Sequence, residues 1–116
     1  MAALGEIDVD VVVDTGTTVV AFGGEIDLVT APTVRVTLGE QVDRDSLRLL
    51  VIDLSEVSFL DSTGIAAIAF AIRLSSDRGV AIRLCCVQPH VRRVLEITGL
   101  ADLWPLFDSR AAAASA

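Results

Sequence analysis

Apolar and polar residues alternate near the beginning of the chain. Apolar side chains occupy every second position of Ile7–Val13, and Asp8 and Asp10 stand between them. A period of two is typical of a strand that buries one face, and we expect this one at the edge of a sheet. Turn residues follow, and Thr18–Phe22 is a second β-branched and aromatic run that Gly23–Gly24 would end. The two runs predict a β-hairpin.

Three later segments carry apolar residues at the spacing of a helix that buries one face. The first begins after Thr30, which we expect to cap it, and has apolar residues at every fourth position of Val34–Val42. The second runs from Ser62 or Thr63 to Ser76, and the third opens at Pro89, because proline is tolerated in a first helical turn. Three helices are therefore predicted.

Nearly continuous apolar runs lie between and after these helices. Leu47–Leu54 and Val80–Val87 are typical of strands that are buried on both faces. Trp104–Phe107 predicts a last short strand. We expect residues 1–109 to form a single domain and residues 110–116 to be a flexible C-terminal tail.

The predicted order is an N-terminal hairpin followed by alternating helices and strands, β-β-α-β-α-β-α, with a short final strand. This order predicts an α/β fold with a mixed sheet, whose later strands are parallel and joined by right-handed crossovers. The carboxyl ends of parallel strands meet at one edge of a sheet, where binding sites gather. Residues 24–30, 55–63 and 88–90 should therefore share one rim.

The composition and net charge limit the classes of partner that the protein can bind directly. The 116 residues are 53% hydrophobic, and 16 acidic residues against 9 basic ones give a net charge of -7. Such a charge repels phosphate backbones and anionic lipid heads, so we expect no direct nucleic-acid or membrane partner. The longest uncharged run, residues 62–72, is about half of the roughly 20 residues that a membrane-spanning helix needs. The first residues do not show the basic region followed by an apolar stretch that is typical of a secretory signal, and we therefore expect a cytoplasmic protein.

Several catalytic classes lack an essential residue. The chain contains no Lys, Tyr or Asn and a single histidine, His90, which excludes Schiff-base and P-loop lysines and a papain-type triad. Ser62 lacks the Gly-x-Ser-x-Gly pattern of a serine hydrolase, because position 60 is Leu. We expect no enzymatic activity, no catalytic residue and no cofactor.

The two cysteines are adjacent, at Cys85 and Cys86. Consecutive residues on a strand point to opposite faces, so a disulfide between them would need a strained backbone. Cys86 with His90 is a poor zinc site, because Cys85 would point away and only two suitable ligands remain. We interpret both cysteines as small buried apolar residues and expect no metal site.

The residues around the second helix start could carry chemistry. Ser62 places a hydroxyl where the helix dipole and free N–H groups favour an anion such as a phosphate. Taken by itself, Ser62 has the residue type and position of an N-cap, and Asp61 fits the same role. Glu25 and Asp27 follow the second strand, and by themselves they are typical solvated turn residues.

Three segments together resemble the STAS domain of bacterial anti-sigma factor antagonists: Gly24–Pro32, then Val51–Leu54 with Phe59–Ile65, then Val94–Leu100. The similarity spans Ile7–Phe107. In that family the unmodified antagonist binds an anti-sigma factor that is also a serine kinase, and so frees a sigma factor. The kinase phosphorylates the antagonist and ends the complex, and a serine phosphatase resets it.

The resemblance implies a role for individual residues. Ser62 matches the phosphorylated serine of the family, and the loop that contains Asp27 matches one that meets the partner. The residues implied in partner binding are Gly24, Glu25, Asp27, Thr30, Asp61, Thr63 and Gly64. The chain departs from the family at Ala66, where a glycine is frequent, and we expect this change to affect packing or partner fit before phosphorylation.

Two other functions stay open at this point. A stand-alone STAS domain could sense a nucleotide, lipid or other small ligand, or scaffold a signalling complex, without being phosphorylated. A small thiol oxidoreductase that uses Cys85 or Cys86 is the third interpretation. A phosphorylatable binding module without catalysis is the one that the resemblance favours.

Overall fold

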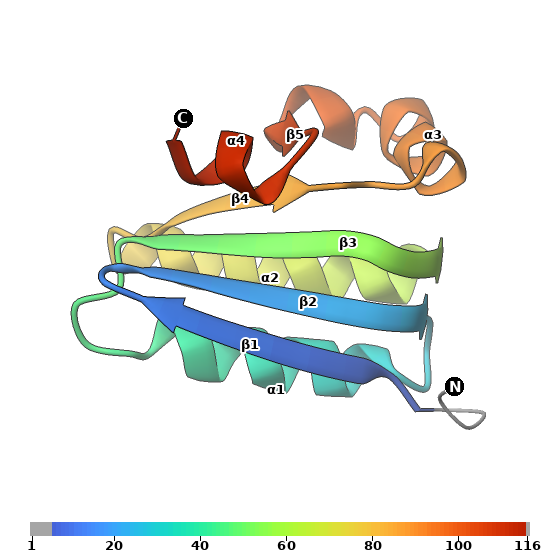
Figure 1. Cartoon of the computed structure of the whole chain (residues 1–116). Coiled ribbons are helices and arrows are strands. Elements are labelled where there is room, and N and C mark those ends of the chain that lie inside the picture. The colour runs from blue at the N-terminus through green and yellow to red at the C-terminus, as the bar shows by residue number, and fades with distance from the viewer. Residues whose placement is uncertain (1–5, 116) are drawn as a thin grey trace.

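The computed structural model describes residues 6–115. Within this range one sheet has the order β1-β2-β3-β4-β5, with β1 antiparallel to β2 and each later pair parallel (Figure 1). The strands are β1 Asp8–Asp14, β2 Thr17–Ile26, β3 Leu49–Leu60, β4 Ala81–Cys85 and β5 Leu106–Phe107. The helices are α1 Ala31–Val42, α2 Ser62–Asp77, α3 Pro89–Ile97 and α4 Arg110–Ser115, with a 3-10 turn at Leu100–Asp102. This arrangement confirms the predicted mixed α/β fold with its N-terminal hairpin.

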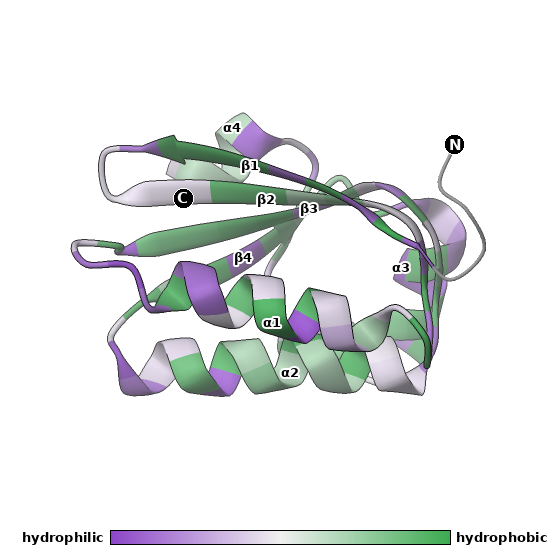
Figure 2. Ribbon diagram, turned by 90° about the horizontal axis from the view of Figure 1, so that it is seen from below, coloured by the Kyte–Doolittle hydropathy of each residue, from purple (hydrophilic) through white to green (hydrophobic). Residues whose placement is uncertain are grey.

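Helices α1 and α2 lie side by side against one face of the sheet (Figure 2). Val34 and Leu38 of α1 and Ile68 of α2 are fully buried there, because the four-residue spacing puts them on the sheet side of each helix. They pack with strand residues such as Phe22 and Ile52 in the main core. Removal of these side chains from water is the main force that fixes the layers. Among the described residues, every helix falls short of the length and hydrophobicity that crossing a bilayer requires.

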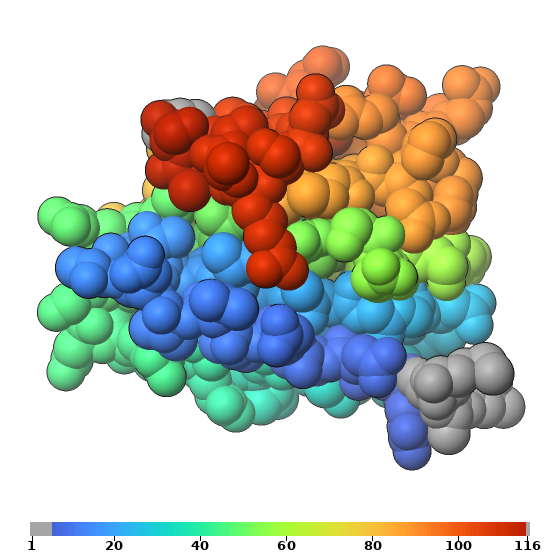
Figure 3. Space-filling view, in the orientation of Figure 1, coloured from blue at the N-terminus to red at the C-terminus, as the bar shows by residue number. Residues whose placement is uncertain are grey.

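The opposite face of the sheet is covered in part by α4, over β3 and β4, whereas most of β1 and β2 is left open (Figure 3). Ala113 of α4 is fully buried in a second apolar cluster with Leu49 and Val51. Arg83 Nη1 donates a hydrogen bond of 2.7 Å to the Ala113 carbonyl. The expectation of a flexible tail from residue 110 is therefore wrong for Arg110–Ser115, which forms a docked helix.

Strands β2 and β3 both run further than their hydrophobic patterns predict. Gly23 and Gly24 do not end β2: its register with β3 shifts before Gly23 and after Gly24, and the strand continues to Ile26. Gly24 has a φ of 120°, which residues with a side chain rarely adopt. Likewise β3 continues to Leu60, through residues that were expected to form a loop. Both strands therefore end together at one rim.

Candidate functional site

The carboxyl ends of β2 and β3 are joined directly at this rim. Ile26 and Leu60 are register partners, and the Asp61 N–H donates to the Ile26 carbonyl at 3.2 Å. The segment before α3 reaches the same place, because Gln88 Nε2 donates to the Ser55 carbonyl at 2.7 Å. The prediction that three loops share one rim is confirmed. We call the surface formed by residues 24–30 and 59–64 the Ser62 rim.

Asp61 caps α2 and fixes its first turn. Its Oδ1 accepts hydrogen bonds from the N–H groups of Thr63 at 2.9 Å and Gly64 at 3.1 Å, and from the Thr63 hydroxyl. The bond from that hydroxyl, with the two N–H bonds, holds the pKa of Asp61 below its usual value. Asp61 is therefore an anion at neutral pH and satisfies N–H groups that otherwise lack a partner.

Ser62 is the first residue of α2 and is exposed, so its expected role as the N-cap is wrong. Within residues 6–115 its hydroxyl makes no hydrogen bond. Because Asp61 caps the helix, the Ser62 hydroxyl is left exposed to solvent. Hydrogen bonds of Asp61 to Thr63, Gly64 and Ile26 fix the helix start on which Ser62 stands. A free hydroxyl on a rigid backbone is well placed to react or to meet a partner.

Gly64 lets the first turn of α2 lie directly on the two strand ends. A Cβ at this position would be 2.6 Å from Ile26 Cγ2, 2.6 Å from Leu60 Cδ1 and 3.0 Å from the Ile26 carbonyl oxygen. Any side chain would push the helix start away from the sheet, since carbon atoms in contact need about 3.5 Å or more. Gly64 thus determines how closely the helix start that carries Ser62 approaches the ends of β2 and β3.

The loop after β2 is held by reciprocal bonds between Asp27 and Thr30. Asp27 Oδ1 accepts from the N–H groups of Val29 at 3.0 Å and Thr30 at 3.1 Å. The Thr30 hydroxyl accepts from the Asp27 N–H at 3.0 Å and donates to the Glu25 carbonyl at 2.7 Å. Thr30 stands before α1 as predicted, but its side chain makes no cap bond to that helix. The loop instead turns Leu28 outward, where 73% of its surface is exposed.

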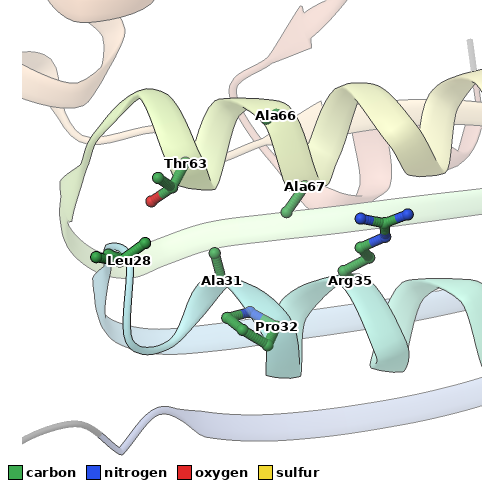
Figure 4. A pocket seen from close by; sticks show the side chains of 7 residues that line it. All are labelled: Leu28, Ala31, Pro32, Arg35, Thr63, Ala66 and Ala67. Atoms are coloured by element: carbon green, nitrogen blue, oxygen red, sulfur yellow. The ribbon is translucent and has the colours of Figure 1, made fainter.

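A hollow of about 250 Å³ lies between the first turns of α1 and α2, beside the Ser62 rim. Its lining, seen in Figure 4, consists of Leu28, Ala31, Pro32, Arg35, Thr63, Ala66 and Ala67. All of these are apolar except a threonine and an arginine, and the Arg35 guanidinium stacks over the Phe70 ring at 3.9 Å. Ala66, where the chain departs from the family, is exposed in this hollow. Its methyl group therefore shapes a surface and not the core.

Large apolar side chains are also exposed on the Ser62 rim. Leu28, Val29 and Phe59 are exposed by 73%, 64% and 44%, although all three are large and apolar. Residue patterns alone missed them, and the only signal was their position beside polar turn residues. Of the residues implied in partner binding, Thr30 and Gly64 are buried, so they support the rim from inside. Exposed apolar groups that gather in one place are typical of interaction surfaces.

The two cysteines lie elsewhere, on the face that α4 covers. The prediction that their side chains diverge is wrong, because β4 ends at Cys85 and Cys86 has a left-handed φ of 65°. Burial, chiefly, raises the pKa of Cys85 to about 12, which disfavours the reactive thiolate that a thiol oxidoreductase needs. His90 does not join them. Its Nε2 contacts the Ser58 carbonyl, just before the residues of β3 that belong to the Ser62 rim.

Comparison with known proteins agrees with this geometry. The sequence profile of the STAS domain matches residues 8–113, and the chain belongs to the STAS domain family. It is 38% identical over 112 residues to the anti-sigma-F factor antagonist RsfB of Mycobacterium tuberculosis, covering 94% of this chain and 88% of that protein. It is 31% identical over 94 residues to an anti-sigma F factor antagonist of Paenibacillus polymyxa, covering 81% of this chain and 80% of that protein.

A solved structure is similar over almost its whole length. The crystal structure of an anti-sigma factor antagonist from Mycobacterium paratuberculosis superposes with a TM-score of 0.87 at 34% identity, covering 99% of this chain and 97% of that one. The shared fold therefore includes the strand ends that carry the Ser62 rim.

Proposed function

We propose that this protein is an anti-sigma factor antagonist. In its unphosphorylated form it binds an anti-sigma factor with serine kinase activity and so frees a sigma factor, and phosphorylation of Ser62 ends the complex. It acts in the cytoplasm as a binding module without catalysis, and a serine phosphatase resets it. The names of its relatives support the antagonist function. The free, exposed Ser62 hydroxyl at a fixed helix start carries the assignment of the switch.

The Ser62 rim has the character of a protein-binding surface. Leu28, Val29 and Phe59 offer apolar area to a partner, and the exposed carboxylate of Glu25 borders them. Such a surface, an apolar centre with a polar edge, is common in protein interfaces. The neighbouring hollow of about 250 Å³ is smaller than the roughly 300–1,000 Å³ of usual small-molecule sites. Its size favours a partner side chain over a nucleotide as the occupant.

Phosphorylation would change this surface without unfolding it. A phosphoserine adds about -1.5 to -2 charges. The N-terminus of α2 favours an anion, so the helix tolerates the phosphate at Ser62. Asp61 is already charged next to it, and Asp27 lies in the loop across the rim. A partner surface that fits a neutral hydroxyl then faces several like charges, and complementarity is lost.

The test is phosphorylation by a candidate anti-sigma factor kinase. The full chain is incubated with the kinase and ATP, and intact mass spectrometry counts the phosphoryl groups on wild type, Ser62→Ala and Ser55→Ala. Ser55 is the matched control, because it is an exposed serine near the same edge of the sheet. We expect one phosphoryl group on wild type and Ser55→Ala and none on Ser62→Ala. Equal phosphorylation of Ser62→Ala would show that the site is misassigned.

Complex formation separates the two parts of this proposal. Each variant is mixed with the anti-sigma factor without ATP and analysed by size-exclusion chromatography. Unphosphorylated wild type should form a complex, and Ser62→Ala should do so as well, because a methyl group preserves the neutral surface. If the protein neither binds any candidate anti-sigma factor nor gains mass, a ligand-sensing or scaffolding role replaces the antagonist function.

A further inference from the structure

Two thiols and a carboxylate converge under α4, on the face of the sheet opposite α1 and α2. Asp53 and Cys85 are register partners on β3 and β4, so their side chains share one face. Cys86 is the next residue, and its left-handed φ places its thiol on the same side of the sheet as the Cys85 thiol. The two Sγ atoms and one Asp53 carboxylate oxygen all lie within 4.8 Å of one another. Within residues 6–115, no other trio of ligand side chains converges this closely.

The backbone keeps this arrangement in place. The Cys86 N–H donates to the Phe107 carbonyl at 2.9 Å, which ties the left-handed residue to β5. That conformation is unfavourable for a residue with a side chain, so the surrounding structure maintains it. As a result, the sulfur atoms of these two consecutive cysteines lie close to each other on one side of the sheet. Cys85 is fully buried, whereas Cys86 is partly exposed and leaves a way in from solvent.

The charges around the thiols suit a divalent cation. Asp53 is buried and pairs with Arg110 Nε of α4 at 2.6 Å, and its other oxygen accepts the Ser55 N–H at 2.8 Å. With both thiols protonated, the group of four side chains is neutral. When a divalent cation replaces the two thiol protons, which leave to solvent, two thiolates, one carboxylate, one guanidinium and the cation again sum to zero. A buried site avoids the large penalty of unpaired charge in both states.

We propose that Cys85, Cys86 and Asp53 bind one soft divalent cation of the d¹⁰ group, such as Zn²⁺ or Cd²⁺. Thiolates select soft metals, and a carboxylate is an accepted third ligand of zinc. Zinc–sulfur bonds of about 2.3 Å put tetrahedral ligands about 3.8 Å apart, so the three groups need to close by at most roughly 1 Å. Arg110 stays beside the carboxylate and balances the third negative ligand.

The test is a Cd²⁺ titration of the reduced full chain. Bound Cd²⁺ is counted by equilibrium dialysis, and thiolate ligation is followed by its charge-transfer absorption in the ultraviolet. We expect one Cd²⁺ per chain, with thiolate absorption that saturates at that ratio. The variants are Cys86→Ser, at the more exposed thiol, and His90→Ala as the control, since His90 is the only imidazole of the chain.

Cys86→Ser should weaken Cd²⁺ binding by more than the roughly 10–100-fold that loss of an outer-sphere partner causes, while His90→Ala binds as wild type does. Circular dichroism of each variant checks that it is folded. Because the wild-type titration requires no substitution, lack of stoichiometric binding there overturns the proposal. So does a folded Cys86→Ser variant that keeps the wild-type affinity, or a loss of binding in His90→Ala.

Discussion

Alanine at Gly64 tests how closely α2 lies on the strand ends. The added Cβ would be 2.6 Å from two methyl carbons, of Ile26 and Leu60, and 3.0 Å from a backbone oxygen that already accepts the Asp61 N–H. The carbons must separate by about 1 Å, and overpacking of this kind costs about 1–3 kcal/mol. Alanine also gains up to about 1 kcal/mol over glycine in a helix. We expect a net loss of about 1–2 kcal/mol in the free energy of unfolding.

Gly39 is the matched control, because it lies inside α1 and nothing is within 4 Å of a Cβ built there. Gly39→Ala should therefore stabilise the protein by about 0.5–1 kcal/mol. Urea unfolding followed by circular dichroism gives both values, with the m-values compared to exclude changes in compactness. If Gly64→Ala is as stabilising as Gly39→Ala, the close contact between α2 and the strand ends is wrong.

Three further changes test individual contacts. Asp61→Ala should lower the free energy of unfolding by about 0.5–2 kcal/mol, and Asp61→Asn should lower it much less, since asparagine also caps helices. Denaturant unfolding at pH 7 measures both values. Burial raises the pKa of Asp53, but hydrogen bonds from Arg110 and Ser55 outweigh it and the net pKa is lowered. Asp53→Asn should therefore cost about 1–3 kcal/mol at pH 7, a difference that shrinks below about pH 4, as acid unfolding curves would reveal. Ala113→Asp puts an unpaired charge in a buried position, so limited proteolysis should release α4 faster while circular dichroism of the rest is unchanged.

Periodicity predicted the three longer helices and the main strands of this protein. The buried stripe of α1 and the continuous apolar run that becomes β3 are local features, because each residue's environment follows from its spacing. The shared rim followed from chain order, since parallel strands place their carboxyl ends together. The C-terminal end of β3 could not be predicted from the sequence, because its exposed part contains Ser55, Glu56 and Ser58, which are typical of a loop.

The features that sequence reasoning missed depend on contacts between distant residues or on one backbone angle. Helix α4 is alanine-rich, without an apolar stripe of its own, and docks through Arg110 and Asp53, which are 57 positions apart. The choice between Asp61 and Ser62 as the N-cap is a shift of one position, which residue type cannot decide. The left-handed Cys86 reverses the expected direction of a thiol, and no sequence pattern signals it for a non-glycine residue.

The proposed switch is tested most directly by the affinity of one anti-sigma factor for two forms of this protein. Calorimetry with the full chain compares unphosphorylated protein with protein phosphorylated fully at Ser62, after circular dichroism has established that both are folded. Like charges brought together at an interface cost several kcal/mol, so phosphorylation should weaken binding by roughly 100-fold or more. Equal affinity of the two folded forms would contradict a switch at Ser62.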